Sequence, residues 1–102
     1  MSAVKTTMQN HPLAGMLFHS YDREGVLHFQ GKVVSVFDAS GKTVAMCQLF
    51  SFLDGMPTDV LMYDVGEMIA VLNDSHTQFK FYRSEPEWLL AYEKYTDRRR
   101  AA

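Results

Sequence analysis

Short runs of apolar and aromatic residues alternate with turn-forming residues along most of the chain. Each run is roughly 5–8 residues long, the usual length of a β-strand, and turns favour residues that tolerate a positive φ angle. The six glycines punctuate these runs, at Gly15, Gly25, Gly31, Gly41, Gly55 and Gly66. This rhythm predicts a small antiparallel barrel or sandwich.

The pattern predicts five strands, over residues 16–21, 26–38, 43–52, 59–63 and 78–83. In the long second strand, Leu27 and Phe29 have the opposite parity to the later apolar pair of Val34 and Val36. One extra residue between the two pairs returns them to a common face. We therefore expect a bulge or sharp bend at Gly31.

A helix is predicted over residues 85–97. Ser84 and Glu87 have the spacing of a capping box, and the apolar side chains that follow share one helical face. We expect Trp88, Leu89 and Tyr92 to pack on the barrel, beside the inward-facing Phe79 and Phe81 of the last strand. Residues 64–72 are ambiguous, since their pattern fits either a strand with one helical turn or a helix.

The length of 102 residues supports one domain with a single core. The expected fold class is α+β, mainly β: a five-stranded, strongly bent antiparallel sheet or barrel with one C-terminal helix. Residues 1–12 are expected to form a flexible tail, residues 13–97 the domain, and residues 98–102 a basic tail.

Two resemblances accompany this pattern. Five short strands, a bent second strand and a terminal helix resemble the SH3-like or Tudor-like group of small barrels. The stretches QLFSFLDGMPT (48–58) and FKFYRSE (79–85) resemble short uncharacterised bacterial proteins of the kind encoded by orphan or mobile-element genes. Neither resemblance implies a catalytic residue, and barrels of this type have many functions.

Composition narrows the class of protein. A hydrophobic fraction of 47% excludes a disordered chain, and a net charge of −2 gives no overall attraction to nucleic acid. Residues 53–75 contain acids but no lysine or arginine. The lone Cys47, the lack of an apolar leader and the absence of a membrane-length apolar run predict a soluble, cytoplasmic protein.

Two histidines are the candidate metal ligands. If the first turn is symmetric about Arg23 and Glu24, His19 and His28 become cross-strand neighbours on the face away from the core. Two imidazoles at that spacing can share a metal ion, but a site needs a third ligand, and His76 is a candidate by residue type alone. The alternative is that both are ordinary surface histidines. We expect Cys47 to be a buried core residue, and we predict no cofactor.

Aromatic residues are more numerous than one small core needs. Tyrosine and tryptophan favour interfaces because they combine a large apolar area with a polar group. The candidates for a binding surface are Tyr21, Tyr63, Tyr82, Trp88 and Tyr92. The alternative is that these side chains attach the helix to the strands.

The expected function is a non-catalytic module that binds a protein or peptide through an aromatic and acidic surface, its own copy in a homodimer included. The first alternative is a small-ligand or metal-binding protein centred on His19 and His28, with or without enzymatic activity. The second is a nucleic-acid-binding barrel that uses Lys32, Lys42 and the terminal arginines, although the net negative charge counts against it. No catalytic motif indicates an enzyme, and no membrane partner is expected.

Overall fold

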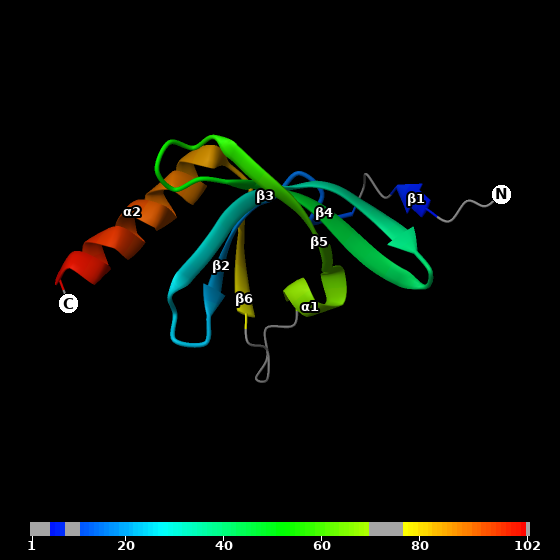
Figure 1. The fold of residues 1–102 in the computed structure, drawn as a ribbon, viewed down its shortest axis with the longest axis horizontal. Helices are drawn as coiled ribbons and strands as arrows, with labels where there is room; N and C mark the ends of the chain where they lie inside the picture. The colour runs from blue at the N-terminus through cyan, green and yellow to red at the C-terminus, as the bar shows by residue number, and fades with distance from the viewer. Residues whose placement is uncertain (1–4, 8–10, 70–76, 102) are drawn as a thin grey trace.

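The computed structural model describes residues 5–7, 11–69 and 77–101. Its elements follow one another as β1 (Lys5–Thr7), β2 (Leu17–Asp22), β3 (Leu27–Ala39), β4 (Lys42–Phe50), β5 (Pro57–Asp64), α1 (Val65–Ile69), β6 (Thr77–Tyr82) and α2 (Glu85–Ala101) (Figure 1). Five strands form an open antiparallel sheet in the order β5-β4-β3-β2-β6. The predicted α+β class, with its five-stranded sheet and C-terminal helix, is confirmed.

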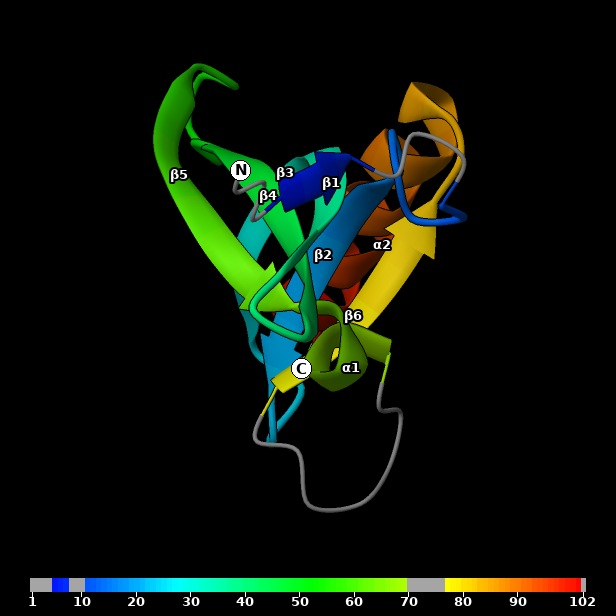
Figure 2. The ribbon, with the colours of Figure 1, turned by 90° about the vertical axis from the view of Figure 1, so that its right-hand side faces the viewer.

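Strand β1 is an addition to the prediction. It lies within the segment expected to be a flexible tail, and it pairs antiparallel with the end of β3 from Phe37 to Ala39. In the main sheet, β5 and β6 stand at the two ends of the strand order. Figure 2 shows these two strands on opposite sides of the molecule, separated by the bend of the sheet.

The bulge in β3 lies at Val34 and not at Gly31. The pairing of β3 with β4 shifts register between Val33 and Ser35, which leaves Val34 as the extra residue. Gly31 is required for a different reason: a Cβ atom there would lie 2.5 Å from the carbonyl oxygen of Gln48. The parity change was therefore a correct sign of a bulge, but its position was wrong.

The core fills one face of the sheet. Its buried residues are Leu13, Phe18, Val33, Val36, Ala45, Cys47, Leu49, Val65 and Met68. The rings of Phe79 and Phe81 lie 5.6 and 6.4 Å from that of Phe18, so both face inward as predicted. Helix α1 contributes Val65 and Met68, which resolves residues 65–69 of the ambiguous segment as a helix; residues 70–72 lie outside the described part of the chain.

Helix α2 packs on the opposite face of the sheet. The Ser84 hydroxyl accepts the Glu87 backbone N–H at 3.4 Å, in agreement with the predicted start of the helix. Trp88 is only 8% exposed, and its Nε1 donates a hydrogen bond to the Phe18 carbonyl oxygen at 3.0 Å. The predicted burial of Trp88 is thus confirmed, whereas Leu89 is 48% exposed and its predicted packing is wrong.

Two further expectations about α2 are corrected. The helix continues to Ala101, so the arginines that follow Asp97 belong to the helix and not to a separate basic tail. Trp88 lies against Phe50 and His19 on the face opposite to Phe79 and Phe81, so the helix does not pack on the surface predicted for it. Successive side chains of a strand point to opposite faces of the sheet. The core lies on one face, and α2 covers the other.

Candidate functional site

The turn between β2 and β3 separates the two candidate metal ligands. The Asp22 N–H donates to the Val26 carbonyl oxygen at 2.9 Å, and Gly25 has a φ of 82°, so the turn has three central residues. The register then shifts between Ser20 and Tyr21, which leaves His28 as an extra residue in β3. A symmetric turn was the premise of the predicted histidine pair, and that premise fails.

His19 pairs with Gln30, and the predicted pairing of His19 with His28 is wrong. His28 is exposed, and its Nε2 lies 3.4 Å from Asp22 Oδ2 at the turn. Within residues 5–7, 11–69 and 77–101, no three His, Cys, Asp or Glu side chains are grouped to hold a metal ion. His76 lies outside these ranges. The alternative of a metal site on these histidines has no geometric support.

His19 is a fully buried residue. Burial lowers the pKa of its imidazole to about 4, and the neighbouring Gln30 side chain opposes part of this shift. The ring is therefore neutral at pH 7. Its Nδ1 lies 3.3 Å from the Tyr82 hydroxyl oxygen, while Nε2 is buried with no hydrogen-bond partner among the described residues.

Four aromatic rings surround the His19 imidazole. The ring centroids lie 6.3 Å away for Tyr21, 5.1 Å for Tyr82, 5.8 Å for Trp88 and 6.5 Å for Tyr92. These are four of the five aromatic residues selected from the sequence. They come from β2, β6 and α2, and they join the helix to the sheet around one neutral ring.

Tyr63, the fifth candidate, belongs to the other face. Its ring lies 6.3 Å from Phe18 and 5.2 Å from Phe79, against the core. Cys47 is also buried there, and burial raises the pKa of its thiol to about 12. The thiol therefore stays protonated at neutral pH, as expected for a core residue.

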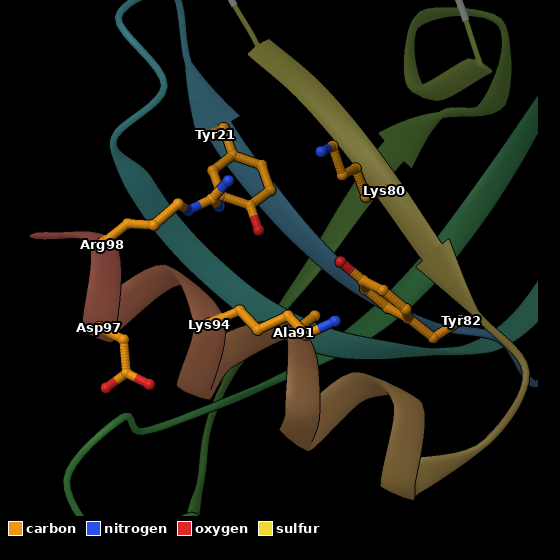
Figure 3. A pocket seen from close by; sticks show the side chains of 7 residues that line it. All are labelled: Tyr21, Lys80, Tyr82, Ala91, Lys94, Asp97 and Arg98. Carbon is orange, nitrogen blue, oxygen red and sulfur yellow. The ribbon is translucent and has the colours of Figure 1, made fainter.

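A surface hollow of about 460 Å³ opens between β6 and α2, next to the His19 cluster. It is lined by Tyr21, Lys80, Tyr82, Ala91, Lys94, Asp97 and Arg98 (Figure 3). Burial is the main cause that raises the pKa of both the Tyr21 and the Tyr82 hydroxyl. Both phenols are protonated at neutral pH, so they offer the hollow neutral hydroxyl groups.

A second hollow of about 300 Å³ adjoins the first and shares Tyr21, Lys80 and Arg98 with it. Its remaining lining residues are Gly25, Gln78, Tyr95 and Arg99. The two linings together contain the cationic side chains Lys80, Lys94, Arg98 and Arg99, against the carboxylate of Asp97. This local excess of positive charge contrasts with the net charge of −2 for the whole chain.

Two of the cations lie over aromatic rings. Lys80 Nζ is 5.6 Å from the centroid of the Tyr21 ring, and the Arg99 guanidinium carbon is 5.8 Å from that of Tyr95. The Tyr95 hydroxyl oxygen also accepts the Leu27 backbone N–H at 3.0 Å. These contacts position the cations at the mouths of the hollows, and they cover one face of each ring.

A third hollow, of about 560 Å³, lies at the start of α2 and is lined in part by Gln30, Lys32, Arg83, Glu85 and Trp88. Its lining has two cations, Lys32 and Arg83, and one carboxylate, Glu85, so its excess of positive charge is smaller. Lys32, a candidate of the nucleic-acid alternative, is therefore placed apart from Arg98 and Arg99, which line the second hollow.

Sequence reasoning missed the cationic side chains of the first two hollows as a group. Arg98 and Arg99 were assigned to a tail, and Lys80 was given no role. One signal was present: Lys94 and Arg98 are four residues apart, the spacing that places side chains on one face of a helix. The predicted helix ended at residue 97, so Arg98 lay outside it and the spacing could not be applied; the observed helix continues to Ala101.

None of the helices in the described residues is long and apolar enough to span a membrane. No family model, no curated protein and no solved structure matches this chain.

Proposed function

We propose that this chain is a non-catalytic interaction module that binds an acidic segment of a partner protein or peptide in the two adjoining hollows between β6 and α2. The observation that carries the proposal is that Lys80, Lys94, Arg98 and Arg99 all line these two hollows. Carboxylates bound there gain charge-assisted hydrogen bonds from the cations. The protonated Tyr21 and Tyr82 hydroxyls add neutral polar groups to the same wall.

The shape of the site supports an extended ligand over a single small anion. The cations are distributed over two hollows that share three lining residues, and they do not converge on one point. An extended acidic segment offers several carboxylates at successive positions. Each cation then has a partner without a change in the backbone of β6 or α2.

Single-stranded nucleic acid is the second candidate, because the same cations also suit phosphate groups. Proteins that bind single strands usually add open aromatic faces on which the bases stack. Here Lys80 lies over Tyr21 and Arg99 over Tyr95. The covered rings favour carboxylates over bases, and the net charge of −2 works in the same direction.

Fluorescence anisotropy with a labelled glutamate-rich peptide tests the proposal. We expect saturable, salt-sensitive binding that Arg98→Glu reduces by at least about tenfold, since one partner becomes a like charge. Arg83→Glu is the matched control, because it makes the same charge change outside both hollows. A glutamine-rich peptide of equal length controls for charge.

The proposal is wrong if the acidic peptide does not bind, or if both arginine variants weaken it equally. A labelled single-stranded oligothymidylate of matched charge forms the second arm. Stronger binding of this oligonucleotide, with the same sensitivity to Arg98→Glu, overturns the acidic-peptide assignment in favour of the second candidate.

A further inference from the structure

We propose that β5 is a self-association edge: two copies of the chain join their β5 strands antiparallel about a two-fold axis at Leu61. The resulting dimer has one sheet that continues from one copy into the other. This surface lies at the opposite end of the strand order from β6 and the hollows beside it. The proposal therefore stands independently of the acidic-peptide function.

The outer side of β5 is an open sheet edge. The strand pairs with β4 on one side, and in the part of the chain that the structure describes no strand pairs with its other side. Figure 2 shows β5 as the outermost strand on its side of the molecule. A long open edge exposes backbone N–H and C=O groups and is a ready template for another strand.

Exposed apolar side chains mark the same edge. Val60 is 52% exposed and Met62 is 58% exposed. They are two residues apart and pair with Gln48 and Met46 of β4, so both lie on one face of the sheet. Within the described residues, the backbone of α2 lies close to β2 and β6, and its Trp88 reaches Phe50 at the end of β4. The helix makes no such approach to β5, so it leaves this part of the face uncovered.

The edge has no arginine or lysine, so its partner strand must tolerate Asp59 and Asp64. An antiparallel pairing centred on Leu61 meets this requirement. It places Val60 opposite Met62 of the second copy, apolar against apolar, and Asp59 opposite the Tyr63 of the second copy. No carboxylate then faces another carboxylate.

Neighbouring registers are less favourable. Centring the axis on Met62 places Val60 opposite Asp64 of the second copy, and centring it on Val60 places Met62 opposite Thr58. In the Leu61 register, the three positions at the centre of the pairing, Val60, Leu61 and Met62, all lie in the part of β5 that pairs regularly with β4. The strand is thus most complementary to itself in the Leu61 register.

Sedimentation velocity over a concentration series tests both the dimer and its register. We expect a reversible dimer that Val60→Lys weakens by about tenfold or more, because the two-fold axis makes each substitution act twice. Met62→Glu is expected to weaken it to a similar degree. In the double variant Val60→Lys/Met62→Glu, each introduced lysine faces an introduced glutamate, so the dimer is expected to recover relative to either single variant.

The matched controls separate charge, fold and register. Val60→Lys/Met62→Lys carries two substitutions at the same sites without complementary charge and should stay monomeric. Leu90→Lys changes an apolar side chain of 50% exposure on α2 and should dimerise like the parent. Thermal melts confirm that each variant is folded.

A parent chain that is monomeric at every concentration overturns the proposal. A dimer that Val60→Lys leaves intact does the same. A dimer that both single variants weaken, with no recovery in the oppositely charged double variant, overturns the Leu61 register. None of these outcomes depends on binding of the acidic peptide, which is measured with a different ligand at a different edge.

Discussion

The two halves of the sheet differ in what covers the face away from the core. Over β2 and β6, helix α2 packs so closely that the polar His19 ring is fully buried among aromatic rings. Over β5, the apolar side chains of Val60 and Met62 remain more than half exposed. A polar residue is thus buried in one half while apolar residues are exposed in the other. Burial in this fold depends on where the helix lies, more than on the polarity of each strand residue.

The covered half supports the fold, and the uncovered half is free for other copies or partners. Among the described residues Nε2 of the buried imidazole has no hydrogen-bond partner, which is costly, and the aromatic packing around the ring offsets that cost. An exposed apolar edge carries no such internal role. Substitutions should therefore reduce stability in the covered half and alter association in the uncovered half.

The largest expected effect comes from Trp88→Ala. Removing the indole leaves a cavity beside His19 and breaks the hydrogen bond to the Phe18 carbonyl oxygen. We expect a loss of about 3–5 kcal/mol in the free energy of unfolding. Urea denaturation measures it, and Leu89→Ala, at a half-exposed neighbouring site, should cost about 0.5 kcal/mol or less. Equal losses in the two variants would show that α2 is not held by the indole.

The second effect is a loss of stability in acid that depends on His19. Its pKa is lowered from 6.5 to about 4 in the folded protein, so the unfolded chain binds a proton first as the pH falls. The stability that depends on a neutral His19 is fully present above pH 6.5 and is lost as the pH falls towards 4. The total loss in the free energy of unfolding is about 3 kcal/mol.

Denaturation at pH 7 and at pH 4.5 measures this change. His19→Phe should reduce the difference between the two stabilities, whereas His28→Gln, at the exposed turn, should preserve it. If the two variants have the same pH dependence, the acid sensitivity comes from groups other than the buried imidazole.

A third effect concerns the position where the two halves meet. Gly31 pairs with Phe18 of β2 on one side and Leu49 of β4 on the other. A Cβ atom there would lie 2.5 Å from a backbone oxygen and 2.8 Å from the Phe18 ring. Gly31→Ala should therefore cost about 1–3 kcal/mol. In the same strand, Val34→Ala at the exposed bulge should change stability by about 0.5 kcal/mol or less. Thermal melts of both variants measure the two losses, and equal losses would contradict the close approach at Gly31.

The sequence predicted those features that depend on local chemistry. Strand positions follow from short apolar runs, and the start of α2 follows from Ser84, because a capping side chain acts within one turn. The register of the first hairpin was not predictable in this way. It depends on a three-residue turn and on one extra residue at His28, and neither changes the apolar pattern of the flanking strands.

The candidate site was predictable in part for a related reason. Tyr21, Tyr82, Trp88 and Tyr92 were identified as residues that exceed the needs of the core, and the structure brings them together. Their common neighbour His19 was considered as a metal ligand or a surface histidine, because the strand pattern predicts the face on which it lies but not that α2 covers that face. The cations of the hollows belong to β6 and α2, and no local pattern indicates that these two elements lie side by side.

The smallest expected effect is at β5 and is the sharpest comparison of a covered with an uncovered position. Val60→Ala and Val36→Ala remove the same two methyl groups, but Val60 is 52% exposed and Val36 is fully buried. At protein concentrations where the chain is monomeric, we expect Val36→Ala to cost about 2 kcal/mol in unfolding free energy and Val60→Ala about 0.5 kcal/mol or less. Urea denaturation gives both values. At high concentration, the Val60 variant should lose additional stability relative to the parent, because dimerisation of the folded chain stabilises it by mass action. A Val60 penalty that is large and independent of concentration would place this side chain in the structural part of the sheet, and the distinction between the two halves would not hold at β5.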